Sequence, residues 1–223
     1  MSARPESAAD RLINQSPPLP ARNSRDTRRV LNRRSDGDSA VLVDPEQATA
    51  SLRTWFPDLP GSVQGLRFGW SPGRLDPEYL GDRSAFDAAF LIDAGDGTRG
   101  VVGVDCRYLE QAKAETPPSG EHMTRYRQVT ERSGIFTAAW EQAVVGTDLQ
   151  PLWRNHLLAL SMAQHFRDRW SWVRFVVVHP AGNSSFADAA GRYRAVLTDG
   201  TTFEVHTLEA LRSVTGRTEA LWL

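Results

Sequence analysis

Asp87, Asp105 and Arg107 are the residues whose types and spacing could support chemistry. Two carboxylates held side by side repel each other, and a divalent cation between them removes that repulsion. Oxygen ligands suit Mg²⁺, and also Mn²⁺, so the pair predicts a site for one of these ions. A neighbouring arginine could stabilise negative charge on a phosphoryl group during its transfer. The alternative is a surface hairpin in which Asp87 caps a strand end and the other two residues are solvated.

The segments that carry these residues are typical of a β-hairpin. Its two strands are predicted over residues 88–93 and 101–108, which are rich in apolar and β-branched residues. Gly95-Asp96-Gly97 between them tolerates positive φ, and a three-residue loop there places Asp87 opposite Asp105. Arg107 lies two residues beyond Asp105 and therefore shares its face. A register shift of one residue would move Asp87 to the other face of the sheet.

Four further polar residues are candidates for the same site, each with a structural alternative. Glu46 stands in the first turn of a predicted helix, where its charge would also favour the helix dipole. Asp82 precedes the hairpin and is either a second acid near the metal or part of a loop ion pair with Arg83 or Arg74. His156 lies on the apolar face of a predicted helix, where a packed histidine is expected. His179 ends a predicted strand, a common location for ligand contacts in α/β proteins.

The order of predicted elements is typical of an α/β protein. Asp44-Pro45 is a helix start, and the residues 173–179 (VRFVVVH) predict a strand that is buried on both faces. Such a strand belongs in the centre of a mixed sheet. The predicted order is helix 44–55, strand 63–70, the hairpin, helices 123–133, 135–145 and 151–169, strand 173–179, a helix from 183, strand 201–206 and helix 208–214.

Length and charge predict one domain preceded by an arm. The chain has 223 residues, a net charge of −1 and 40% hydrophobic residues, enough for one core over residues 40–223. Residues 1–39 are polar, and we expect them to be flexible. The first 34 residues contain eight arginines against three acidic residues. This arm either contacts DNA phosphates or is a soluble leader.

Cysteine content and hydropathy exclude several classes of protein. Cys106 is the single cysteine, so an internal disulfide and a thiolate zinc cluster are both excluded. No apolar run approaches the length of a membrane span, and the N-terminus lacks the apolar core of a signal peptide. We therefore expect a cytoplasmic protein without a membrane partner.

Several short sequence words resemble the PD-(D/E)XK nuclease superfamily, in particular a bacterial group of restriction-endonuclease-like proteins. The words are WSPG (70–73), GDRSAFD (81–87), GVDCRY (103–108), LWRNHLLAL (152–160) and PAGN (180–183). The resemblance implies a restriction-endonuclease-like mixed β-sheet flanked by helices. It also implies that Asp87, Asp105 and the carbonyl of Cys106 bind Mg²⁺. The family usually has Glu-x-Lys where this chain has Asp105 and Arg107.

By this resemblance, the expected activity is metal-dependent hydrolysis of DNA phosphodiesters, weakened by the two replacements. Arg107 would take the place of the lysine that orients the attacking water, and arginine is bulkier, planar and always protonated. The first alternative is a catalytically inactive relative that binds DNA or a partner protein in a defence or restriction system. The second is an interaction protein that retains only the fold. A homodimer is compatible with each.

Overall fold

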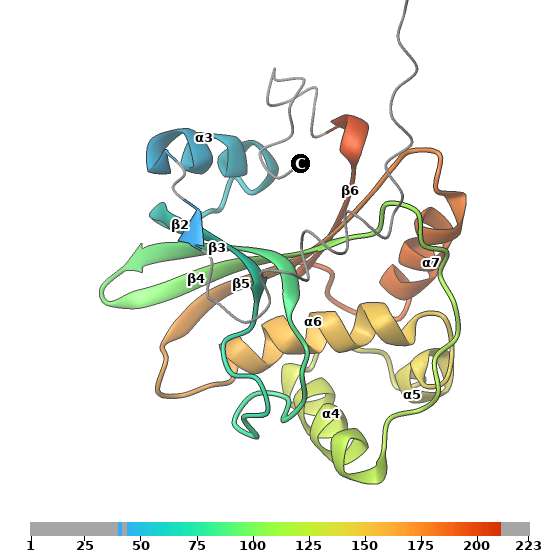
Figure 1. Cartoon of the computed structure of the whole chain (residues 1–223). Helices are drawn as coiled ribbons and strands as arrows, with labels where there is room; N and C mark the ends of the chain where they lie inside the picture. Colours follow the sequence, from blue (N-terminus) through green and yellow to red (C-terminus); the bar gives the residue numbers. More distant parts are fainter. Residues whose placement is uncertain (1–39, 42–43, 211–223) are drawn as a thin grey trace, which may run out of the picture.

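A six-stranded mixed sheet forms the centre of the computed structural model, which describes residues 40–41 and 44–210 (Figure 1). Neighbouring strands follow the order of the sequence, and the sheet is antiparallel from β1 to β4 and parallel from β4 to β6. The strands are β1 (Ala40–Val41), β2 (Ser62–Trp70), β3 (Phe86–Gly95), β4 (Thr98–Cys106), β5 (Trp170–His179) and β6 (Phe203–Thr207). This arrangement confirms the predicted α/β fold with a mixed sheet.

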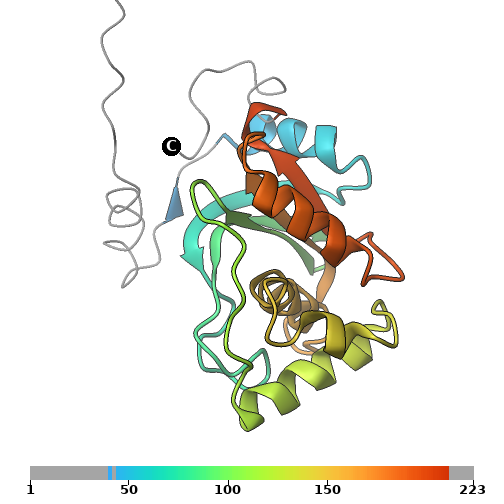
Figure 2. The ribbon, with the colours of Figure 1, turned by 90° about the vertical axis from the view of Figure 1, so that its right-hand side faces the viewer.

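Helices cover both faces of the sheet. Helix α3 (Pro45–Trp55) lies on one face, and Asp44 caps it by accepting hydrogen bonds from two backbone N–H groups of the first turn. The other face carries α4 (Gly120–Ser133), α5 (Trp140–Val144), α6 (Gln150–Ala163) and α7 (Ser184–Arg194) (Figures 1 and 2). The sheet therefore separates two hydrophobic cores.

Alternate residues of β4 enter different cores. Val102 and Val104 pack with α3, whereas Val101 packs in the core beneath α6. Because side chains alternate along a strand, Asp105 points to the α6 face. The same alternation along β3 places Asp87 on that face, because Ala89 packs in the α6 core and Ala88 in the α3 core.

The turn between β3 and β4 is one residue shorter than predicted. Gly95 pairs with Thr98, so the loop contains only Asp96 and Gly97, with φ of 53° and 67°. Two positive φ values suit the favoured two-residue hairpin turn. A bulge between Asp93 and Gly95 absorbs the extra residue, so the pairing further along the hairpin is the predicted one.

Two helices are shorter than the hydrophobic pattern predicts. Helix α6 ends at Ala163 rather than at Arg169, which has a positive φ of 53°. Residues 135–145 are helical only in α5, because Phe136 leaves the helix to pair with Leu197 in an isolated bridge. The predicted arm over residues 1–39 and most of the predicted helix 208–214 lie outside the described residues.

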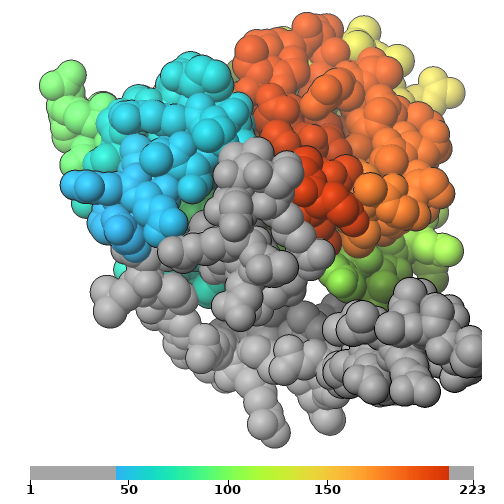
Figure 3. Space-filling model, turned by 90° about the horizontal axis from the view of Figure 1, so that it is seen from above, coloured from blue at the N-terminus to red at the C-terminus, as the bar shows by residue number. Residues whose placement is uncertain are grey.

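The face seen from above shows α3 beside the region of residues 184–210 (Figure 3). Trp55 of α3 stacks on His206 of β6 with ring centroids 4.8 Å apart, which joins these two parts. Across residues 40–41 and 44–210, none of the helices has the length and apolarity that crossing a membrane requires.

Candidate active site

The hairpin of β3 and β4 brings the two predicted acids together. Ala88 pairs with Val104, so Asp87 and Asp105 stand opposite each other at the next position of the ladder. Burial, and next the negative charge of Asp105, raise the pKa of Asp87. The predicted pairing is therefore confirmed, whereas the metal-binding role of the pair stays a prediction.

Asp105 is a buried carboxylate with one crowded oxygen. Its exposed fraction is 3%, and its Oδ2 accepts hydrogen bonds from Arg107 Nε at 2.9 Å and Nη2 at 2.6 Å. The same oxygen accepts a third hydrogen bond, at 3.0 Å, from the side-chain amide of Asn155 on α6. Buried carboxylates require such donors, because an uncompensated charge away from water is costly.

Asp87 is held in a different way. Its Oδ2 accepts a hydrogen bond of 2.8 Å from the backbone N–H of Cys106. Burial, and next the negative charge of Asp105, raise the pKa of Asp87 to about 7, while the Cys106 N–H and Arg107 oppose the rise. Asp87 therefore exchanges a proton near neutral pH, as expected when two carboxyl groups share a small space.

Arg107 keeps its charge in this setting. Burial alone would lower the pKa of its guanidinium, but Asp105 outweighs burial and the pKa is raised. The guanidinium lies 5.7 Å from the centre of the Phe186 ring, and Arg107 N–H donates to the Val178 carbonyl at 2.8 Å. Packing and backbone pairing thus fix the cation beside the acid pair.

The thiol of Cys106 is not part of the acid cluster. Its side chain packs on the α3 side of the sheet, and burial, followed by the charges of Asp87 and Asp105, raises the pKa of the thiol. A neutral, partly buried thiol is a poor nucleophile. Any contribution of Cys106 to the site must come from its backbone, which already donates to Asp87.

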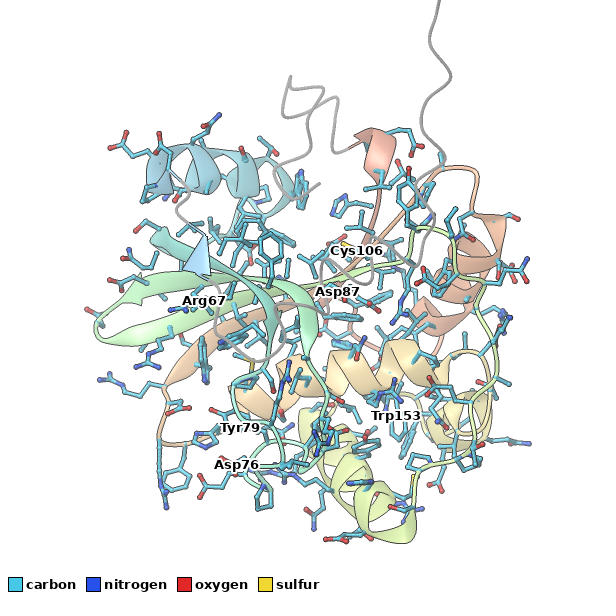
Figure 4. The ribbon with its side chains drawn as sticks, viewed as in Figure 1. Arg67, Asp76, Tyr79, Asp87, Cys106 and Trp153 are labelled. Carbon is cyan, nitrogen blue, oxygen red and sulfur yellow. The ribbon has the colours of Figure 1, made fainter. Side chains whose placement is uncertain are left out.

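An open cleft of about 460 Å³ has the acid pair and Arg107 in its wall. Figure 4 shows Asp87 and Cys106 at the sheet, with Trp153 on the helical layer and Tyr79 in the β2–β3 connection. The cleft is lined by Asp82, Arg83, Ser84, Ala85, Asp87, Asp105, Arg107, Tyr126, Arg154 and Asn155. Two arginines besides Arg107 therefore border a cleft that contains the two acids.

The sequence did not single out Asn155, Arg154 or Tyr126 as site residues. Arg154 and Asn155 are on α6, and Tyr126 is on α4, far from the hairpin in the chain. Arg154 forms an ion pair with Glu115 at 2.7 Å beside the cleft. The available signal was the word LWRNHLLAL, which contains three consecutive polar residues, Arg154, Asn155 and His156, within a largely apolar helix.

Three of the four other polar candidates, Glu46, His156 and His179, do not line the cleft. Glu46 is exposed in the first turn of α3 and does not line the cleft. His156 is fully buried and hydrogen-bonds the hydroxyls of Tyr193 at 2.9 Å and Thr202 at 2.8 Å. Burial lowers the pKa of His156 to about 3, so it is a neutral core residue. His179 is 2% exposed and hydrogen-bonds the adjacent Pro180 carbonyl.

Asp82 lines the cleft, but it forms no ion pair with an arginine of the described residues, so the predicted pairing with Arg83 or Arg74 was wrong. Its carboxylate accepts hydrogen bonds from Ser84 N–H at 2.7 Å and Ser84 Oγ at 2.8 Å. The hydroxyl of Tyr126 also donates to it. Arg74, one of the proposed partners, donates instead to the Gly69 carbonyl at 2.6 Å. Asp82 therefore stabilises a turn and connects it to α4 through the hydrogen bond from Tyr126.

The acid pair is compatible with a hard divalent cation, although Asp87 and Asp105 supply only two carboxylate ligands. Among residues 40–41 and 44–210, no group of three or more His, Cys, Asp or Glu side chains could hold a metal ion. Mg²⁺ commonly takes one or two carboxylates and retains several waters, so Asp87 and Asp105 with the Cys106 carbonyl fit this need. Since Asp105 Oδ2 already accepts three hydrogen bonds, a cation would compete with Arg107 or use the other oxygen.

The comparisons with known proteins agree with this geometry. A search of curated proteins finds no match for the chain. The sequence profile of one family, described as the PD-(D/E)XK nuclease superfamily, matches residues 40–220, which is most of the chain. The α/β fold with its mixed sheet is consistent with this family. The chain therefore belongs to the PD-(D/E)XK nuclease superfamily.

Proposed function

We propose that this protein hydrolyses DNA phosphodiester bonds with the help of Mg²⁺ or Mn²⁺ bound at Asp87 and Asp105. The observation that carries the proposal is the pair of opposed carboxyl groups beside Arg107 in an open cleft. Membership of a nuclease superfamily supports this reaction class. A bound cation would polarise the scissile phosphate and lower the pKa of an attacking water.

The chain's own residues would hold and orient the reacting groups. Asn155 fixes the rotamer of Asp105 by its hydrogen bond of 3.0 Å, and the Cys106 N–H fixes Asp87 in the same way. Arg107 keeps its positive charge at the acid pair and would stabilise negative charge on the phosphate in the transition state. In the reaction the water oxygen bonds to phosphorus, the P–O bond to the leaving group breaks, and that oxygen gains a proton.

A second candidate function is DNA or partner binding without hydrolysis, as part of a defence or restriction system. The specific observation in its favour is that Arg107 donates twice to Oδ2 of Asp105, which leaves a metal only the other oxygen unless it displaces Arg107. Arginine also orients a water less well than lysine, because its charge is spread over a planar group. A displacement on the order of 1 Å in a catalytic site can cost about 100-fold in rate.

A plasmid-nicking time course in Mg²⁺ distinguishes the two candidates. The test compares the natural protein, Asp87→Ala, and the double variant Asp105→Glu with Arg107→Lys. We expect slow nicking by the natural protein, none by Asp87→Ala and faster nicking by the double variant, because Glu and Lys restore the usual reach of both groups. Nicking that persists in Asp87→Ala would contradict the assigned site. No nicking by any of the three proteins would favour the binding function.

A further inference from the structure

Three arginines line the cleft, and two of them are already paired with carboxylates. Arg107 is bound to Asp105 at 2.6 Å, and Arg154 is bound to Glu115 at 2.7 Å. Their charges are therefore largely compensated before any substrate arrives. Arg83 differs, because no carboxylate in the described part of the chain forms an ion pair or hydrogen bond with it. It is an exposed cation on the rim of a cleft that contains the two acids.

The neighbouring acid, Asp82, is prevented from neutralising Arg83. Both oxygens of the Asp82 carboxylate are engaged, one by Ser84 N–H and the other by the hydroxyls of Ser84 and Tyr126. A carboxylate that is satisfied by three hydrogen bonds has little to gain from a solvent-exposed ion pair, whose typical value is below about 1 kcal/mol. The guanidinium of Arg83 consequently stays available to an external anion.

The backbone at Arg83 is fixed on both sides. The carbonyl of Asp82 accepts a hydrogen bond from Leu75 N–H at 2.6 Å. The side chain of Asp82 stabilises the turn by accepting a hydrogen bond from Ser84 N–H. Tyr126, which contacts Asp82, comes from α4, so the turn is anchored to the helical layer. The connection between β2 and β3 thus holds Arg83 at a defined place on the rim, four residues before Asp87. A pre-positioned arginine loses less entropy on binding an anion than one on a mobile loop.

We infer that Arg83 binds a backbone phosphate that neighbours the scissile phosphate, and so selects a polynucleotide over a single phosphate ester. This inference rests on the proposed function, because it assigns the scissile phosphate to the acid pair. Arg107 is committed to Asp105 at the centre of the site, whereas Arg83 is exposed on its rim. A ligand that binds the acid pair through one phosphate and Arg83 through another must carry more than one phosphate, as a nucleic acid strand does. The planar fork of arginine matches the oxygens of a phosphate in a bidentate way.

The test is the salt dependence of DNA binding by the full chain, measured by anisotropy with a fluorescein-labelled duplex. EDTA in the buffer prevents hydrolysis during the measurement. Arg83→Gln and Arg132→Gln make the same charge change, but Arg132 is an exposed residue of α4 that does not line the cleft. Loss of one phosphate contact should reduce the slope of log K against log salt by about 0.9 for a duplex. We expect this reduction in Arg83→Gln, no reduction in Arg132→Gln, and a retained slope in Arg83→Lys.

The outcomes separate the inference from the proposed function. Equal slopes for the natural protein and Arg83→Gln, or an equal loss in Arg132→Gln, would overturn the role of Arg83 whether or not the protein nicks DNA. If the slopes are as expected but the protein does not nick plasmid DNA, the role of Arg83 in binding phosphate is supported and only the proposed hydrolysis is contradicted. Absence of DNA binding by the natural protein in EDTA would overturn the role of Arg83, while nicking in Mg²⁺ decides hydrolysis separately. Urea unfolding of each variant confirms that it is folded, and Arg83→Lys provides a variant in which the charge is kept.

Discussion

The oxygen Oδ2 of Asp105 explains how an arginine is held beside the acid pair. Arg107 donates to this single oxygen through both Nε and Nη2, and Asn155 supplies a third donor. A lysine has one ammonium group and could not give the same two-point contact. The negative charge of Asp105 is therefore compensated without a metal ion. Burial and the charge of Asp105 raise the pKa of Asp87 to about 7.

The free energy of unfolding should depend on pH through Asp87. Its pKa rises from 3.8 to about 7 on folding, so the folded state binds more protons between these values. The stabilisation is fully present below the unfolded pKa and is lost as pH rises through the folded pKa, with a slope of at most about 1.4 kcal/mol per pH unit. Urea unfolding in EDTA, at several pH values between pH 5 and 8, measures this loss.

Asp87→Asn is the matched control for this prediction. Asparagine has nearly the shape of a protonated aspartate, and it can still accept from the Cys106 N–H and donate towards Asp105. We expect the variant to be more stable than the natural protein at pH 8 and to lack the loss between pH 5 and 8. Burial also depresses the pKa of His156, but that contribution is common to both proteins and cancels in the difference. Parallel pH profiles would contradict the assigned pKa.

At the scale of the strands, close packing next to the acid pair requires a glycine in β4. A Cβ at position 103 would lie 2.4 Å from the ring of Phe86, the buried residue directly before Asp87. Gly103→Ala should therefore destabilise the protein by about 1–3 kcal/mol, because the ring must move within a packed core. Urea unfolding measures the change.

Gly65→Ala in β2 is the control for this packing effect. Position 65 is also a strand glycine, but a Cβ there meets nothing within 4 Å, so we expect little change in stability. Adding Phe86→Leu to Gly103→Ala should recover part of the loss, because it removes the ring that causes the clash. A Gly103→Ala protein as stable as the natural one would show that this contact does not constrain the hairpin.

The hairpin was predictable from the sequence, whereas the helical wall of the site was not. Pairing within the hairpin depends on a short turn and on alternating burial, and both are local features, so Asp87 opposite Asp105 followed from spacing. The turn itself was mispredicted by one residue, and the bulge compensated for it. Asn155 reaches Asp105 across 50 positions of sequence, and that contact depends on how α6 crosses the sheet. No periodicity in the sequence determines such a crossing.

At the scale of the whole molecule, the two faces of the sheet have different roles. The α3 face is an apolar core next to β2, β3, β4 and β5, and the other face carries the acid pair above α6. The mixed sheet and an interior position for β5 were predictable, because β5 has a dense run of valines and is buried over most of its length. β5 is the fifth of six strands, between β4 and β6, rather than the central strand. The ends of α5 and α6 were not predictable, because tertiary contacts such as the Phe136–Leu197 bridge override helix propensity there.

The parallel pairing of β4 with β5 has a consequence for the order of folding. The β3–β4 hairpin closes a loop of two residues, whereas β5 can join β4 only after residues 107–169 have been enclosed. Hairpins form in about 1–10 μs, and pairings between distant segments are slower. The two aspartates should therefore meet in the transition state for folding, before Asn155 arrives. In stopped-flow experiments we expect a high φ-value for Ile92→Val in β3 and a low one for Val205→Ala in β6. The reverse order would mean that the helical layer, rather than the hairpin, nucleates the site.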